Sequence, residues 1–144
     1  MCIRDRLSVL RPEMADQVLP EAHRRNVGVV VREPLANGYL TGALNEQTQF
    51  RPDDQRSVWP RERHVANVRK ARALEFLIRP DRTLAQSSLA WILAQPGVCT
   101  VIAGSANRQQ LEWNMAASEA PPLTAQELER VAELQRTNFG VPVG

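Results

Sequence analysis

Four residues at the start of a helical segment could bind an anion. Gly104, Ser105, Ala106 and Asn107 follow a short apolar run and lead directly into that segment. A helix N-terminus carries free backbone N–H groups and a partial positive charge, so it binds phosphate and carboxylate groups. Gly104 lets a ligand approach the backbone closely, and Ser105 adds a hydroxyl donor. The alternative is an ordinary strand-to-helix turn capped by Asn107, and the residues alone leave both interpretations open.

Two amide side chains follow in the same segment. Gln110 and Asn114 are four residues apart, which places them on one face of a helix. A second polar stretch, Arg32–Gly38, also follows an apolar run. Its Asn37–Gly38 pair is typical of turns, so the stretch could be a plain connection or part of a binding loop.

Two buried strands are expected to position these turns. Val27–Val31 and Thr100–Ala103 are short β-branched runs of the kind found in parallel sheets, and Leu7–Leu10 is interpreted as the end of a third strand. We expect the first two strands to be parallel and adjacent. Ligands of α/β folds bind on loops at the carboxyl ends of strands, so both turns lie where a cofactor could bind.

Helical periodicity and capping signals predict helices between the strands. Alternation of strands and helices indicates an α/β fold with a parallel sheet and right-handed crossovers. By contrast, residues 43–60 lack apolar periodicity, and we expect much of this stretch to pack poorly. The expected helices span Pro12 to Arg25 with a break at Pro20, Glu62 to Ile78, Thr83 to Gln95, and Arg108 to Ser118, with a last helix after Thr124.

An ordered series of motifs resembles one enzyme family. Pro34–Gly42, with the sequence PLANGYLTG, is similar to the loop after the seventh strand of the aldo-keto reductases. Thr83–Val98 looks like that family's penultimate barrel helix, and Val101–Asn114 looks like its last strand and the start of its last helix. The resemblance implies an α/β fold that is a C-terminal fragment of a TIM (β/α)8 barrel, with parallel strands and flanking helices. A complete barrel typically needs about 250 residues, against 144 here.

The same resemblance implies a nicotinamide cofactor, NADP with NAD as the alternative. In the family, positions matching Gln110 and Asn114 approach the adenosine half, and Pro34–Gly38 wraps the pyrophosphate. Arg32 stands where many members have an aromatic residue that stacks on nicotinamide, although it could also be a surface residue. The implied cofactor-binding residues are Arg32, Glu33, Pro34, Leu35, Asn37, Gly38, Leu40, Gly104, Ser105, Asn107, Gln110 and Asn114.

Two cations that bind the 2′-phosphate of NADPH in better-known members are absent. Gly104 stands where those members have Lys, and Gln110 where they have Arg. We therefore expect a weaker preference for NADPH over NADH, unless Arg108 compensates.

No catalytic residue is assigned. Family catalysis uses a Tyr acid with a Lys, an Asp and a His, but Tyr39, Lys70, His23 and His64 match none of those positions. The parent enzyme is expected to reduce aldehydes or ketones to alcohols, and this chain alone is expected to be inactive. The alternatives are a non-catalytic nucleotide-binding or regulatory subunit of the same fold, and an unrelated phosphate-binding barrel enzyme.

Composition narrows the function classes. The net charge is +2 and the basic residues, 17 Arg and one Lys, are interspersed with acidic ones, which argues against a nucleic-acid surface. There is no metal-ligand spacing, no disulfide framework and no apolar run long enough to span a membrane, so we expect a cytoplasmic protein. The small carbonyl substrate is what the family resemblance implies, and the oligomeric state is unknown. Residues 1–6 match no element and look like a translated sequencing adapter, which leaves 7–144 as the barrel domain.

Overall fold

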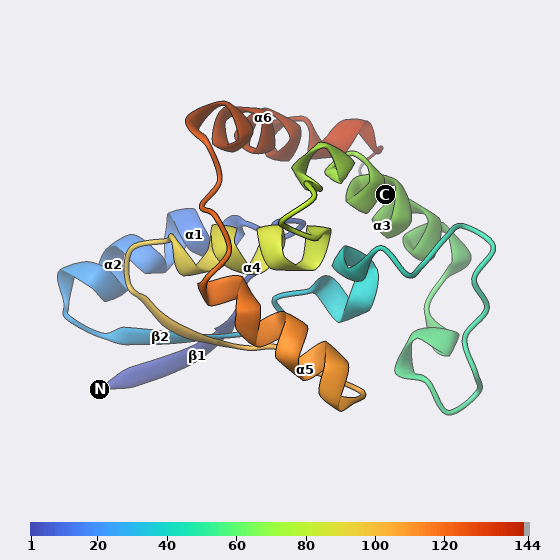
Figure 1. Cartoon of the computed structure of the whole chain (residues 1–144), viewed down its shortest axis with the longest axis horizontal. Coiled ribbons are helices and arrows are strands. Elements are labelled where there is room, and N and C mark those ends of the chain that lie inside the picture. Colours follow the sequence, from blue (N-terminus) through green and yellow to red (C-terminus); the bar gives the residue numbers. More distant parts are fainter. Residues whose placement is uncertain (143–144) are drawn as a thin grey trace.

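Three parallel strands form the sheet of this protein. The computed structural model describes residues 1–142, and its strands are β1 (Cys2–Arg6), β2 (Gly28–Arg32) and β3 (Val98–Ile102), in the order β1-β2-β3. β2 pairs in parallel with both neighbours, and Val31 is aligned with Val101. The prediction that the two apolar runs are adjacent parallel strands is therefore confirmed, and the loops that follow them lie at one end of the sheet (Figure 1).

The helices also follow the predicted order. They are α1 (Glu13–Gln17), α2 (Leu19–Arg24), α3 (Arg61–Arg72), α4 (Leu84–Leu93), α5 (Arg108–Met115) and α6 (Ala125–Arg136), joined in places by short 3-10 turns. In Figure 1, α4 lies between the sheet and α6. The core combines Val29 and Val31 of β2 with Leu89 and Ile92 of α4, all fully buried. No helix in the part of the chain that the structure describes is long and apolar enough to cross a membrane.

Local signals set the helix boundaries. Pro20 lies just after the break that separates α1 from α2. The predicted capping boxes at Thr83 and Thr124 are both formed, each with its reciprocal glutamine or glutamate bond. These contacts span only three residues, which is why the sequence predicts them well.

The prediction for the first strand was wrong. The strand is Cys2–Arg6, a stretch that we expected to match no element, and Leu7–Leu10 forms a buried turn instead. Leu7, Val9 and Leu10 are apolar because this connection passes through the core, not because it is a strand. Cys2–Arg6 pairs along the whole edge of β2 even though only Ile3 and Asp5 are half-buried. Backbone pairing with an open strand edge needs little help from side chains.

Two further expectations need correction. The helix predicted over Glu62–Ile78 ends at Arg72 and is followed by a 3-10 turn at Glu75–Leu77. This change of direction brings Leu74 and Leu77 into the core, where both are fully buried. Residues 43–60 contain no fully buried side chain, as expected, yet they are held by specific contacts. The carbonyl oxygen of Asn45 lies 2.8 Å from Nε2 of His64, and the Glu46 carboxylate pairs with Arg69 and Arg72.

Candidate functional site

A groove opens at the carboxyl ends of β2 and β3. One wall is the turn after β2, including Pro34 and Gly38, and the opposite wall is the turn from β3 into α5, including Gly104 and Ser105. A third side comes from the loop that precedes α3. The groove holds about 1340 Å³ of empty space, counting the part that is open to solvent. Parallel pairing of β2 with β3 is what places the two turns opposite each other.

Most of the predicted cofactor residues meet in this groove, and four do not. Leu40 is fully buried in the core, and Arg32 lies exposed at the end of β2. Asn107 and Asn114 do not line the groove, but their side chains form hydrogen bonds within the β3–α5 turn and its helix. The predicted residues that line the groove are Glu33, Pro34, Leu35, Asn37, Gly38, Gly104, Ser105 and Gln110.

The β3–α5 turn presents free hydrogen-bond donors. Asn114 Nδ2 donates to Ser105 Oγ at 3.0 Å, which leaves the Ser105 hydroxyl hydrogen available to another acceptor. Asn107 Oδ1 accepts the Gln110 N–H at 2.9 Å and Gln110 Oε1 accepts the Ala106 N–H at 2.8 Å, so the turn is capped from both sides. The N–H groups of Ser105 and Asn107 have no acceptor among residues 1–142. The turn can therefore bind an anion through these groups.

The turn after β2 is bonded differently. The N–H groups of Ala36 and Gly38 donate within the turn, to the carbonyl oxygens of Glu33 and Leu35, each at 3.0 Å. Among the N–H groups of Ala36, Asn37 and Gly38, only that of Asn37 has no acceptor in the described chain. This part of the wall thus offers the free N–H group of Asn37, together with the closely approachable backbone of Gly38.

The third side of the groove was not predicted from the sequence. Asp54, Gln55 and Arg56 line it, within the stretch that we expected to pack poorly. Gln55 Nε2 donates to Asn37 Oδ1 at 3.3 Å, and Arg56 Nη1 donates to the Asn37 carbonyl oxygen at 2.8 Å. An Asp and an Arg two residues apart suggest a local ion pair, but no local pattern indicates a partner 19 residues earlier.

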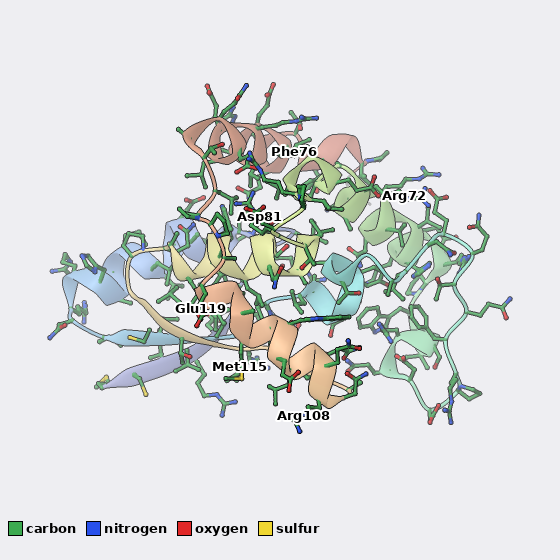
Figure 2. The ribbon with its side chains drawn as sticks, viewed as in Figure 1. Arg72, Phe76, Asp81, Arg108, Met115 and Glu119 are labelled. Carbon is green, nitrogen blue, oxygen red and sulfur yellow. The ribbon has the colours of Figure 1, made fainter. Side chains whose placement is uncertain are left out.

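The groove has few charges that are free to act. Arg56 is the only cation along it within residues 1–142, and it is paired with Asp54 at 2.6 Å. Hydrogen bonds from Arg56 lower the pKa of Asp54 to about 2, so this carboxylate stays ionised near neutral pH. Arg108 is 91% exposed and bonds Glu112 at 2.7 Å. Figure 2 shows Arg108 at the outer end of α5, with its side chain extending away from the ribbon.

The Tyr, Lys and His side chains that match no catalytic position of the family lie away from the groove. Tyr39 and His64 are buried, with the Tyr39 hydroxyl 3.1 Å from His64 Nδ1. Lys70 Nζ donates to Asn138 Oδ1 at 2.5 Å, and His23 is exposed on α2. In the part of the chain that the structure describes, no Tyr, Lys or His lines the groove.

The fold and the groove together define a class of protein. A parallel sheet covered by helices, with a polar groove at the carboxyl ends of neighbouring strands, is typical of α/β proteins that bind nucleotides or cofactors. Here one turn offers anion-binding N–H groups and the other offers an accessible backbone.

Comparison with known proteins gives the family. Residues 2–136 match the model of the Aldo/keto reductase family, and the chain belongs to this family. It is 33% identical over 118 residues to an uncharacterized oxidoreductase of Bacillus subtilis, and 32% identical over 115 residues to an NADP(+) aldo-keto reductase of Schizosaccharomyces pombe. These alignments cover 82% and 77% of this chain, but only 37% and 33% of the two relatives.

Solved structures show the same fold. A glycerol dehydrogenase from Gluconobacter oxydans superposes with a TM-score of 0.80 at 22% identity, covering 99% of this chain and 44% of that one. The chain therefore spans about two fifths of the length of the proteins it matches.

Proposed function

We propose that this chain is the C-terminal part of an NAD(P)-dependent aldo-keto reductase barrel and that its groove binds the cofactor. The complete enzyme would reduce an aldehyde or ketone to an alcohol. The assignment of residues 7–144 to the barrel stays a prediction, although Cys2–Arg6 pairs with β2 and the family match begins at residue 2. The foreign origin of residues 1–6 stays a prediction, which sequencing of the source DNA would test.

The observation that supports the proposal best is the meeting of two distant turns at one groove. Glu33–Gly38 and Gly104–Gln110 are about 70 residues apart in sequence, yet both line it. Their chemistry suits a dinucleotide, because the free N–H groups and hydroxyl at Ser105 favour phosphate and Gly38 lets a ligand approach the backbone. When bound, nicotinamide would supply the hydride.

The groove residues suit NADH at least as well as NADPH. Gly104 and Gln110 offer no cation to a 2′-phosphate, and Arg108 is paired with Glu112. A charge-assisted hydrogen bond contributes roughly 1.5–3 kcal/mol, so each missing cation should cost about tenfold or more in NADPH affinity.

Titration of the 144-residue chain and of the full-length protein with NADH and NADPH tests the proposal. We expect both cofactors to bind, with Ser105→Ala weakening both by roughly fivefold because one hydrogen bond is lost. The matched control is Ser118→Ala, which removes an exposed hydroxyl outside the groove. Arg108→Ala should leave the NADPH-to-NADH ratio unchanged.

Two results would contradict this assignment. If neither cofactor binds the full-length protein, the groove is not a nicotinamide site. If NADPH is preferred by more than about a thousandfold and the preference persists in Arg108→Ala, the 2′-phosphate pocket lies elsewhere.

A further inference from the structure

The turn that lines the groove after β2 has an unfavourable backbone conformation. Ala36 has φ of 49° and Asn37 has φ of 57°, both in the left-handed region, and Glu33 at 53° shares it. A residue with a Cβ atom rarely adopts this conformation, and alanine has no side-chain hydrogen bond to compensate. Such strain persists only where surrounding contacts hold the backbone in place. The contacts that hold this turn therefore determine the shape of one groove wall.

Besides the hydrogen bonds within the turn, two contacts come from a segment 18 to 19 residues further along the chain. Arg56 Nη1 donates to the Asn37 carbonyl oxygen at 2.8 Å, and Gln55 Nε2 donates to Asn37 Oδ1 at 3.3 Å. Arg56 also lies directly against the next residue, because a Cβ atom placed on Gly38 would come within 3.1 Å of Nη1. The guanidinium group thus fixes the carbonyl of one residue and the surroundings of the next.

Arg56 is itself held in place from three directions. Its Nε and Nη2 donate to the two carboxylate oxygens of Asp54 at 2.9 and 2.6 Å. Its backbone N–H also donates to Asp54 Oδ1, at 2.8 Å. The guanidinium carbon lies 4.3 Å from the centre of the Phe50 ring. All three guanidinium nitrogens therefore have a protein acceptor, and the charge is balanced by a bidentate carboxylate.

We propose that Arg56 is a positioning residue, oriented by Asp54, that fixes the strained Ala36–Gly38 turn in the geometry the groove needs. The inference rests on the proposed function only for the identity of the ligand, since every contact belongs to the chain without a ligand. An arginine engaged in this way shapes the wall and does not serve as a free cation for the cofactor phosphates. Without Arg56, the binding-competent turn is populated less, and the apparent affinity falls by the same fraction.

Amide hydrogen exchange and cofactor titration, both on the 144-residue chain, test this role. The reporters are the Gly38 and Leu40 amides, which both donate to the Leu35 carbonyl oxygen. In Arg56→Gln and in Asp54→Asn, we expect these amides to exchange roughly tenfold faster without ligand, and the NADH dissociation constant to rise by a similar factor. Exchange of the Leu89 and Ile92 amides in α4 monitors whether each variant stays folded.

Two further variants separate positioning from direct charge. Arg51→Gln is the matched control, because Arg51 pairs with Asp53 in the same loop but is 85% exposed and does not line the groove, so both readouts should stay unchanged. Arg56→Lys keeps the charge and loses the planar fork, so it should behave like Arg56→Gln.

The opposite pattern would overturn the proposal. If Arg56 binds the cofactor phosphates directly, Arg56→Lys stays near wild type, Asp54→Asn tightens binding because it frees the charge, and exchange at Gly38 does not change in any variant. Unchanged exchange in Arg56→Gln alone also overturns it. If wild type binds neither NADH nor NADPH, the proposed function fails for this chain, while the exchange data still decide whether Arg56 holds the turn.

Discussion

At the scale of single residues, Tyr39 and His64 show how a buried polar pair can serve structure. His64 Nε2 faces the Asn45 carbonyl oxygen, which can only accept, so Nε2 carries the ring proton. In the neutral ring Nδ1 is then the acceptor, and the Tyr39 hydroxyl donates to it. Burial raises the pKa of Tyr39, which keeps this donor protonated. The pair connects the turn after β2 with α3 and with the loop at Asn45.

We expect Tyr39→Phe to lower the free energy of unfolding by roughly 1–3 kcal/mol, because the buried His64 Nδ1 loses its donor. Urea unfolding at pH 7 measures the change. Ser118→Ala serves as the control, since it removes an exposed hydroxyl and should cost less than about 0.5 kcal/mol. Equal stability losses in the two variants would show that the buried contact contributes little.

At the scale of elements, one arginine joins the turn before α4, helix α6 and the segment between α5 and α6. Arg82 Nη2 donates to Glu127 of α6 at 2.7 Å, and Nη1 donates to the carbonyl oxygens of Pro121 and Pro122. Arg82 is 2% exposed and Glu127 is 6% exposed. Burial alone would raise the pKa of Glu127, but hydrogen bonds from the Thr124 N–H, Arg82 and Arg79 outweigh it and leave the pKa lowered.

Arg82→Met should destabilise the protein by roughly 3–5 kcal/mol at pH 7, because it leaves a buried carboxylate with less compensation. The lowered pKa of Glu127 stabilises the wild type above the ordinary value of 4.5, and this contribution is lost as the pH falls through the folded-state pKa. The deficit of the variant should therefore shrink as the pH falls below 4.5 and through the lowered folded-state pKa of Glu127.

Thermal and urea unfolding of Arg82→Met at pH 7 and pH 3.5 measure this trend. Arg136→Met provides the comparison, because Arg136 is exposed on α6, the helix that carries Glu127. The double variant with Glu127→Gln should recover part of the stability. A deficit that does not depend on pH would mean that the lost carbonyl contacts, rather than the carboxylate, dominate.

At the scale of the whole molecule, part of the surface is apolar and open. Within residues 1–142, β1 and β3 each pair only with β2, so both outer strand edges are free. Helix α5 has no buried residue, and its Leu111, Trp113 and Met115 are 49%, 54% and 66% exposed. Figure 1 shows α5 on the outside of the molecule. The turn that leads into α5 lines the groove through Gly104 and Ser105. The groove is open to solvent. No Tyr, Lys or His from the described chain lines it.

We expect the 144-residue chain alone to show no carbonyl reductase activity, because hydride transfer needs a proton donor near the carbonyl oxygen. Tyr39 and His64 are engaged with each other, and Lys70 is engaged with Asn138. Cofactor oxidation with a panel of aldehydes measures this directly. Turnover above background that Tyr39→Phe abolishes would show instead that Tyr39 reaches a substrate.

The sequence by itself determined the elements whose signals are local. The β-branched runs at Val27–Val31 and Thr100–Ala103 are strands within two residues of their predicted bounds. The capping pairs beginning at Thr83 and Thr124, and the resemblance of Pro34–Gly42 to its family, were also visible. Each of these signals involves residues a few positions apart, whose contacts form whenever the element forms.

Only the tertiary structure decided which distant residues meet. Cys2–Arg6 pairs with the edge of β2, although this stretch has no strand signal of its own. Arg56 donates a hydrogen bond to Asn37, 19 residues away in sequence, and Arg82 donates one to Glu127, 45 residues away. Such pairs depend on the positions of whole elements. Since many carboxylates and carbonyl groups could accept from either arginine, packing of the core, rather than any pattern around the arginine, selects the partner.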